Sequence, residues 1–293
     1  MSILDRDSLR ISVNGAEIFF DVEGSGLELK RRSIEEKPVM AILHGGPALD
    51  HSYFKPWLTP LSEYAQLIYV DHRGTGRSAK VPLPTCTIEQ MADDLEELRM
   101  RLGIQNWAVL GNSYGGMWGL TYATRHEKSL SHLTLVDTLA AWKECWKDAQ
   151  KMAEKWGTAQ QKKIYRDLFL GKTHGEKQFK HWFETMLPLY FHKYKKEYMT
   201  MISRMKGAPD VAEYMWQHVT NDYDVRGKIR KLQVPTLVTV GRYDWVTPVS
   251  QSEYLANNIP NSKLVIFERS GHFPFMEERA KFNRTVLQFL AQN

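Results

Sequence analysis

The sequence alternates short segments that are apolar at nearly every position with longer amphipathic ones, and this alternation restricts the fold more than any other feature. Continuous apolar runs are typical of strands buried on both faces of a parallel sheet. Residues 87–102, in contrast, repeat apolar side chains at helical spacing. Strands and helices that alternate in this way indicate an α/β fold, with a mostly parallel sheet and helices on both faces. The strands are expected at residues 39–43, 67–70, 107–110, 133–136, 234–241 and 264–267.

The start of the chain has a different pattern, which predicts a hairpin. Residues 9–22 contain two runs rich in strand-forming side chains, and Asn14 and Gly15 join them. An Asn-Gly pair readily supplies the two positive φ angles of a type I′ turn. We therefore expect an antiparallel pair of strands before the parallel ones.

The alternation stops after Thr138 and resumes at Val234, which indicates an insertion. Residues 140–222 lack strand alternation and read as helices, so we expect a helical cap between a first core part at 1–139 and a second at 223–293. The cap holds five of the nine tryptophans, whose side chains either pack the cap on the core or line a pocket beneath it. These five are Trp142, Trp146, Trp156, Trp182 and Trp216.

Composition and charge exclude several classes of protein. No stretch approaches the roughly 20 consecutive apolar residues of a membrane helix, and the first residues have no apolar signal segment. The two cysteines, Cys86 and Cys145, fit neither a disulfide framework nor a zinc site, so we expect a soluble, cytoplasmic protein without metal or cofactor. The net charge is +5, but its bases are interleaved with acids, so no nucleic-acid partner is indicated. A homo-oligomer is left open.

The segment GNSYGG at 111–116 is the strongest chemical signal, because it fits the pattern G-x-S-x-G. A serine hydroxyl is a weak nucleophile until geometry and a neighbouring base activate it. In a nucleophile elbow, a sharp strand-to-helix turn exposes the serine, and the flanking glycines allow close packing. A predicted strand enters this segment and a predicted helix leaves it. Ser113 is therefore the candidate nucleophile.

A base and an acid are expected at the same edge of the sheet as Ser113. His272 follows the last predicted strand, and Asp244 follows the strand before it, so both belong at the carboxyl edge. The order Ser113, Asp244, His272 is that of an α/β-hydrolase triad. His44 also follows a strand, but it adjoins a glycine pair, and we interpret it as structural support.

A tetrahedral intermediate needs N–H donors for its oxyanion. The residue after the nucleophile, Tyr114, should supply one donor through its backbone. The second should come from the turn at 44–47, with Gly46 as the first choice and Gly45 as the alternative.

The motifs together resemble one family. They are HGGP at 44–47, DHRGTGRS at 71–78, GNSYGG at 111–116, GRYDWVTP at 241–248 and GHFPFME at 271–277. This set is similar to the proline iminopeptidase group of α/β-hydrolases, and the similarity covers essentially the whole core. The resemblance implies a serine hydrolase that removes N-terminal residues, proline above all, from short peptides.

Two substrate-binding positions follow from the resemblance. Members of the group hold the substrate ammonium with acidic residues, one in the cap and often one directly after the triad aspartate. Glu213 stands at a plausible place in the cap, whereas the second position is Trp245. A neutral, apolar substrate of an esterase, lactonase or amidase therefore remains an alternative to a short peptide. A non-catalytic protein that binds a small ligand is a further one.

Overall fold

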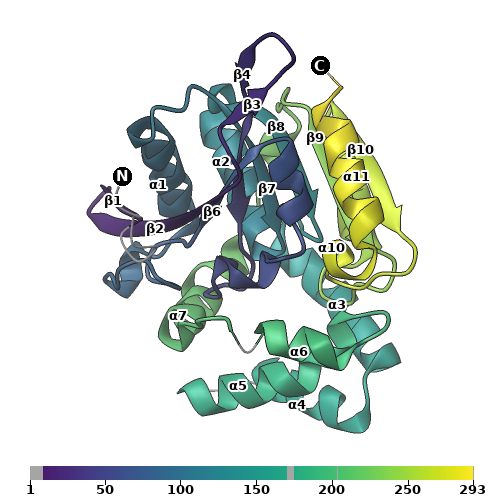
Figure 1. Ribbon diagram of the computed structural model, residues 1–293. Coiled ribbons are helices and arrows are strands. Elements are labelled where there is room, and N and C mark those ends of the chain that lie inside the picture. Colours follow the sequence, from purple (N-terminus) through teal and green to yellow (C-terminus); the bar gives the residue numbers. More distant parts are fainter. Residues whose placement is uncertain (1–8, 170–174, 203, 293) are drawn as a thin grey trace.

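The computed structural model of the 293-residue chain describes residues 9–169, 175–202 and 204–292 (Figure 1). Within this described part, eight strands form one sheet in the order β1-β2-β6-β5-β7-β8-β9-β10. The six strands from β6 to β10 are parallel, whereas β2 pairs antiparallel with β6 and with β1, so the predicted mostly parallel sheet is confirmed. The strands are β1 (Arg10–Val13), β2 (Ala16–Glu23), β5 (Val39–Leu43), β6 (Gln66–Val70), β7 (Trp107–Asn112), β8 (Leu130–Val136), β9 (Thr236–Gly241) and β10 (Ser262–Phe267).

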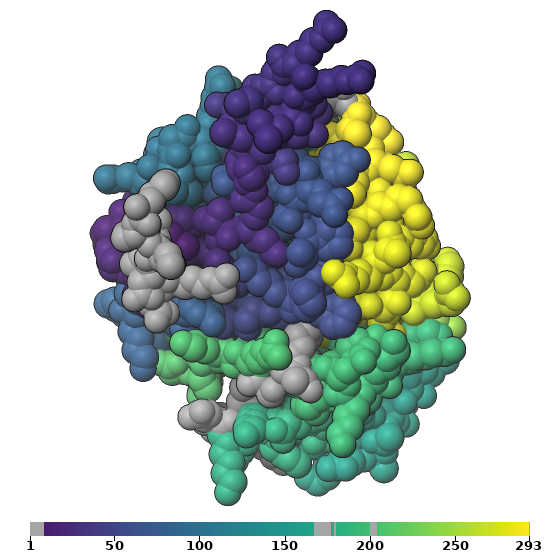
Figure 2. Space-filling view, viewed as in Figure 1, coloured from purple at the N-terminus to yellow at the C-terminus, as the bar shows by residue number. Residues whose placement is uncertain are grey.

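The first hairpin forms through the turn that the sequence predicts. Asn14 and Gly15 have φ angles of 45° and 75°, as a type I′ turn requires. The sequence pattern does not predict a second hairpin, formed by β3 (Leu27–Leu29) and β4 (Ile34–Glu36). Its strand residues are all exposed, so no alternation of apolar and polar residues marks it. Figure 2 shows this hairpin projecting from the top of the molecule.

Helices cover both faces of the sheet, as predicted (Figure 1). The helix expected over residues 87–102 begins after Thr87, whose hydroxyl oxygen accepts a hydrogen bond from the Gln90 N–H at 3.2 Å. This contact satisfies one of the N–H groups that a helix start leaves unpaired. The helices that lie outside the segment between β8 and β9 are α1 (Ile88–Arg101), α2 (Tyr114–His126), α9 (Val249–Asn258), α10 (Pro274–Glu277) and α11 (Arg279–Leu290).

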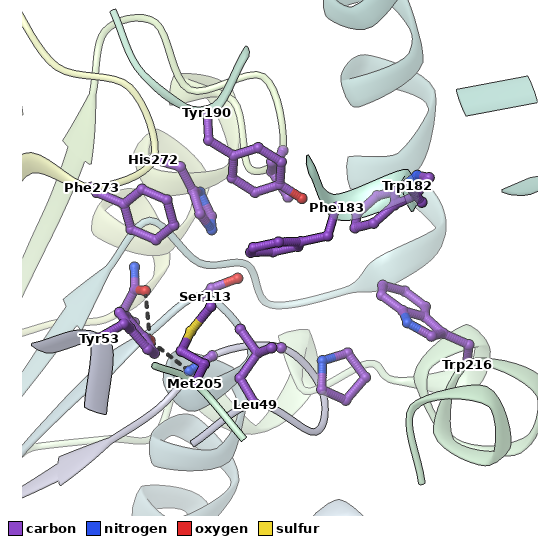
Figure 3. Close-up of a pocket in the computed structure, with 15 residues that line it drawn as sticks. Leu49, Tyr53, Ser113, Trp182, Phe183, Tyr190, Met205, Trp216, His272 and Phe273 are labelled. Atoms are coloured by element: carbon purple, nitrogen blue, oxygen red, sulfur yellow. Dashed lines mark hydrogen bonds between the residues drawn. The ribbon is translucent and has the colours of Figure 1, made fainter. Parts of the chain in front are cut away.

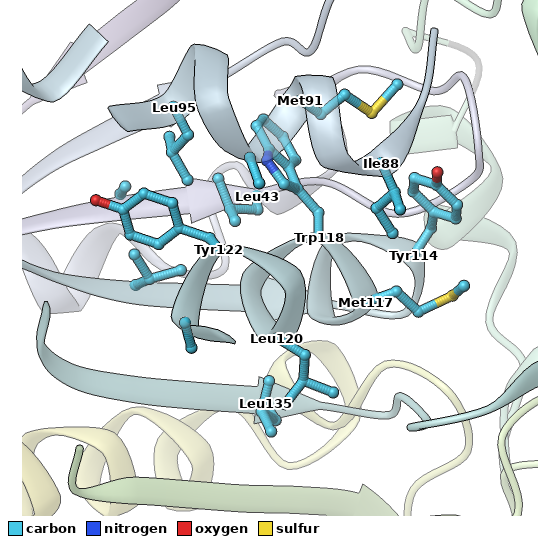
Figure 4. Packing of buried hydrophobic residues seen from close by; sticks show 14 of the residues in the cluster. Leu43, Ile88, Met91, Leu95, Tyr114, Met117, Trp118, Leu120, Tyr122 and Leu135 are labelled. Atoms are coloured by element: carbon cyan, nitrogen blue, oxygen red, sulfur yellow. The ribbon is translucent and has the colours of Figure 1, made fainter. Parts of the chain in front are cut away.

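The two faces of the sheet bury separate hydrophobic clusters. On β5, Ala41 and Leu43 belong to the cluster that includes the apolar sides of α1 and α2. The alternate residues, Met40 and Ile42, belong to the opposite cluster with α11. Figure 4 shows the first cluster, in which Trp118 of α2 lies between α1 and the sheet. These layers fix α2, and therefore the residue that precedes it, against the sheet.

The segment between β8 and β9 is helical, and in Figure 1 it lies below the sheet. It leaves and rejoins the core at one place, because the Val225 N–H donates to the Ala140 carbonyl at 2.9 Å and Ala141 forms a β-bridge with Asp224. None of the helices in the described ranges has the length and apolar character needed to span a membrane. The helices of this segment are α3 (Trp142–Trp156), α4 (Ala159–Phe169), α5 (Gly175–Met186), α6 (Lys196–Ile202), α7 (Pro209–His218) and α8 (Arg226–Ile229).

Candidate active site

Ser113 occupies the sharp turn between β7 and α2. Its φ and ψ angles are 57° and −121°, a combination that residues other than glycine rarely adopt. Two contacts hold the turn: the Ser113 N–H donates to the Val136 carbonyl at 2.8 Å, and the Thr138 hydroxyl donates to the Ser113 carbonyl at 2.7 Å. The geometry is that of a nucleophile elbow.

Two glycines of the motif are required by close approach of the backbone. A Cβ atom added at Gly111 would overlap the carbonyl group of Gly115, where α2 crosses the end of β7. A Cβ atom at Gly115 would overlap the carbonyl group of Leu43 at the end of β5. The glycines therefore bring the elbow close to the strand that leads into the 44–47 turn.

His272 and Asp244 form a buried pair at the carboxyl edge of the sheet. His272 Nδ1 lies 2.8 Å from Asp244 Oδ2, and both residues are almost completely buried. With Nδ1 donating to the carboxylate, Nε2 is the nitrogen left for proton transfer. Figure 3 shows the His272 ring beside Ser113 in one pocket. The structure thus brings together the three residues that the sequence singled out as a triad.

The carboxylate of Asp244 is well supplied with donors. Its Oδ1 accepts the N–H groups of Val246 at 2.8 Å and Thr247 at 3.2 Å, and its Oδ2 accepts the Thr247 hydroxyl at 2.6 Å. Burial alone would raise the pKa of Asp244, but the imidazole of His272 and the Thr247 hydroxyl hold it below the usual value. Asp244 is therefore ionised and positioned to hold the imidazole in one tautomer.

A buried polar network joins the 44–47 turn to the elbow. The Gly45 N–H donates to the Tyr53 hydroxyl oxygen at 2.7 Å, and that hydroxyl donates to Asn112 Oδ1 at 3.0 Å (Figure 3). The Gly45 donor is thus occupied. No acceptor among the described residues takes the Gly46 N–H, and the Tyr114 N–H is at the first position of α2, where no intrahelical acceptor exists.

His44 does not line the pocket that contains Ser113. Its Nδ1 lies 2.9 Å from the Gly45 carbonyl oxygen, its Nε2 accepts the His72 N–H at 3.3 Å, and burial lowers its pKa. Both ring nitrogens are therefore engaged in holding the turn, which is the supporting role expected from the sequence.

The pocket over Ser113 is apolar and aromatic. The space between its walls is about 640 Å³, including the part open to solvent. No Asp, Glu, Lys or Arg side chain is among the described residues that line it, so a ligand meets no fixed charge there. The residues that line it are Gly45, Gly46, Pro47, Leu49, Tyr53, Asn112, Ser113, Trp182, Phe183, Tyr190, Met205, Trp216, Val246, His272 and Phe273.

The two substrate-binding positions implied by the resemblance are outside this lining. Trp245 is buried behind it, where its ring packs edge to face on Tyr190 at 5.4 Å and on Tyr165 at 5.5 Å. Glu213 is half-buried on α7 and accepts a hydrogen bond from Gln217 at 3.3 Å. Trp216, one helical turn further along α7, does line the pocket.

The helical segment between β8 and β9 is bonded directly to the loop that carries His272. The His272 N–H donates to the Tyr190 carbonyl at 2.7 Å. Glu277 accepts the N–H of Gly271 at 2.7 Å, and also those of His192 at 3.1 Å and Lys193 at 2.8 Å. Movement of the segment around residue 190 would therefore also move His272.

Several residues of the site escaped the sequence analysis. Thr247 carried a signal, because a threonine three residues after an aspartate at a strand end can bond back to that carboxylate. Asp137 also carried one, because it directly follows β8 at the carboxyl edge. Tyr53 and Glu277 carried none, since their partners are distant in the sequence. One side-chain atom of Asp137 lies within 4.8 Å of atoms of Asp244 and His272, so the three residues form one buried cluster.

Comparison with known proteins agrees with this geometry. Residues 38–279 match the family model of the alpha/beta hydrolase fold. A proline iminopeptidase from Saccharolobus solfataricus is 30% identical over 277 residues, which are 86% of this chain and 84% of that protein. An esterase from Exiguobacterium antarcticum superposes with a TM-score of 0.70 at 26% identity, over 95% of this chain and 97% of that one. A proline iminopeptidase from Mycobacterium smegmatis gives a TM-score of 0.78 at 20% identity, over 97% of both chains, and shows the shared fold.

The chain belongs to the α/β-hydrolase fold family, as a serine-type hydrolase similar to the proline iminopeptidases. Other proline iminopeptidases match most of the chain with identities as low as 24%. The family resemblance expected from the motifs is therefore confirmed.

Proposed function

We propose that Ser113, His272 and Asp244 form a catalytic triad that cleaves a small ester or amide through an acyl-enzyme. One observation carries the proposal: the elbow serine and the carboxylate-bound histidine open onto the same pocket. Ser113 Oγ attacks the carbonyl carbon while its proton passes to His272 Nε2. The imidazolium then gives that proton to the leaving oxygen or nitrogen. Water repeats the sequence and releases the acid product.

The oxyanion of both tetrahedral intermediates is assigned to two backbone donors, Tyr114 and Gly46. Gly46 lines the pocket and Tyr114 directly follows Ser113, and neither N–H group has a competing acceptor in the described chain. The Gly45 N–H is excluded as a strong donor because it already serves the Tyr53 hydroxyl. Each donor of this kind contributes about 3 kcal/mol to the transition state.

The substrate we favour is neutral and apolar next to the scissile bond. The pocket offers indole, phenyl and thioether surface, and a charged group entering it would lose its hydration without a partner. This supports an ester, a lactone or an amide with a hydrophobic acyl part. Neither Glu213 nor Trp245 lines the pocket. Contact of either residue with the substrate therefore remains a prediction.

An aminopeptidase acting on short peptides is the second candidate. The relatives named above favour it, and Glu213 is one helical turn from a residue that lines the pocket. In this case the Glu213 carboxylate would have to bind the substrate ammonium at the edge of the pocket. We further propose that residues 140–222 act as the cap over the site. The protein would work in the cytoplasm, which suits its two free, buried cysteines.

A panel of matched substrates tests the choice. Pro-, Ala- and Phe-arylamides are assayed with a free and with a blocked amine, beside short-chain aryl esters. The favoured function predicts higher kcat/KM for the esters and for the arylamides with a blocked amine than for the arylamides with a free amine. Glu213→Gln should leave those rates unchanged. A preference for free-amine arylamides that Glu213→Gln abolishes would replace the favoured function with the aminopeptidase.

A further inference from the structure

Asp137 stands out from the other buried acids of the core. It directly follows β8, its φ angle is 49°, and it is fully buried. A positive φ costs free energy in any residue other than glycine, so the surrounding contacts must hold this conformation. Its N–H donates to the Thr239 carbonyl at 2.9 Å, and its Oδ1 accepts the Gly241 N–H at 2.9 Å. These two bonds tie the backbone and the carboxyl group of Asp137 to the end of β9.

The other oxygen of this carboxyl group has no donor. Oδ2 of Asp137 is buried and makes no hydrogen bond among the described residues. The carboxyl group nevertheless lies with Asp244 and His272 in one cluster, whose ligand atoms are within 4.8 Å of one another. An ionised oxygen left without a partner in such a place would carry a large desolvation cost.

Two buried carboxyl groups so close together do not both ionise at neutral pH. Asp244 accepts four hydrogen bonds, from Val246, Thr247 and His272, whereas Asp137 accepts one, from Gly241. The negative charge therefore resides on Asp244. Burial, together with the charge of Asp244, raises the pKa of Asp137 well above its usual value.

We propose that Asp137 is a neutral carboxylic acid that donates its proton from Oδ2 towards Asp244, and that it thereby positions the acid–imidazole pair. This inference rests on the proposed roles of Asp244 and His272. The donated bond would stabilise the Asp244 carboxylate and reduce its tendency to take the proton of His272 Nδ1. His272 would then face one negative charge instead of two. The titratable groups around Asp137 are Asp244, His272 and Glu277.

Two substitutions at this position separate the proton from the side-chain volume. In Asp137→Asn, the amide can donate as the neutral acid does and can still accept the Gly241 N–H. In Asp137→Ala, both contacts are lost. The readouts are the infrared carbonyl band of a protonated carboxyl group in the resting protein, and the midpoint of the acid limb of kcat/KM.

The proposal predicts that the resting wild-type protein shows the protonated-carboxyl band at pH 7 and that Asp137→Asn lacks it. Asp137→Ala should lower kcat by about tenfold at unchanged KM, which is the loss expected for one hydrogen bond to a charged group. Its acid limb should move to higher pH, because an unsupported Asp244 holds the imidazolium proton more strongly. Asp137→Asn should restore both the rate and the midpoint.

Three results would overturn the proposal. The first is the absence of the infrared band. The second is a shift of the acid limb to lower pH in both variants, which would mean that Asp137 is ionised. The third is a loss of stability in both variants with the midpoint unchanged, which would make Asp137 merely structural. The band is measured without substrate, so it tests Asp137 even if Ser113 proves not to be the nucleophile.

Discussion

The floor and the roof of the pocket are built in different ways. The floor consists of Gly46, Ser113 and His272, which line the pocket, and hydrogen bonds and close backbone contacts fix it. The roof consists of Trp182, Phe183, Met205 and Trp216, which come from the helical segment between β8 and β9 and present apolar surface. On the proposed function, the floor would determine the reaction, while the roof would determine which acyl groups reach it.

Asp244→Asn should cause the largest loss of activity among the changes that affect the floor. The asparagine would disfavour the tautomer that leaves Nε2 free, so kcat should fall by about 10⁴-fold. KM should change little, because the side chain does not line the pocket. Circular dichroism and thermal unfolding check that the fold is retained. A loss smaller than about tenfold would show that Asp244 does not hold the catalytic histidine.

The floor also depends on an ion pair beneath the turn. His51 begins the short helix that carries Tyr53, and its Nδ1 lies 2.7 Å from Asp71 Oδ1. Burial alone would lower the pKa of His51, but the carboxylates of Asp21, 3.7 Å from Nε2, and Asp71, 2.7 Å from Nδ1, outweigh it and raise the pKa to about 9. The same contact lowers the pKa of Asp71 to about 2.

The sign of the resulting pH dependence follows from these shifts. Stability from His51 should be complete below its unfolded value, near 6.5, and should be lost as the pH rises through about 9. The loss should approach about 3 kcal/mol, measured by urea unfolding between pH 6 and pH 10. His51→Gln should flatten this dependence. A wild-type protein equally stable at both pH values would contradict the ion pair.

Trp216→Ala tests the roof. Removing the indole takes away apolar surface that a hydrophobic acyl group would contact, so KM for apolar esters should rise by about tenfold or more. The rate constant kcat should stay within about threefold, because the floor is untouched. Glu213→Gln on the same helix is the matched control and should leave both constants unchanged for these esters. A fall of kcat alone in Trp216→Ala would mean that roof and floor are not separable.

Tyr53→Phe should have the smallest effect on kcat/KM, because it removes one oxygen atom from the network under the floor. The Gly45 N–H and Asn112 Oδ1 then lose their partner in a buried place, which should cost about 1–3 kcal/mol of stability. A looser turn should lower kcat by several-fold and leave KM unchanged. Unchanged stability in denaturant unfolding would show that this network does not fix the turn.

The floor could be predicted from the sequence because each of its parts lies within a short motif. Short stretches of sequence are enough to recognise a glycine at a close backbone contact, a serine between a strand and a helix, and polar residues at strand ends. The positions of Ser113, Asp244 and His272 at strand ends, and their order along the chain, were sufficient to predict that they lie together. Asp137 has the same kind of position at a strand end, and its adjacency to Asp244 emerges only from the pairing of β8 with β9.

The roof could not be predicted in the same way. Its residues come from α5, α7 and the residues between α6 and α7, and which side of each helix faces Ser113 depends on tertiary packing. Of the five tryptophans in the segment, Trp182 and Trp216 line the pocket, while Trp142 and Trp146 stack on each other at 5.8 Å. The composition predicted an aromatic segment, but it did not show which tryptophans line the pocket and which pack on each other. The position of the Trp245 side chain could not be predicted from the sequence either, because it depends on packing against Tyr165 and Tyr190 behind the pocket wall.

The most direct test of the central claim is covalent labelling of Ser113. A fluorophosphonate should add once to the wild-type protein, and peptide mass spectrometry should place the adduct on Ser113. Ser113→Ala should take no label and should lose turnover by orders of magnitude, while remaining folded. Labelling at another residue, or near-normal hydrolysis by Ser113→Ala, would contradict the proposed acyl-enzyme.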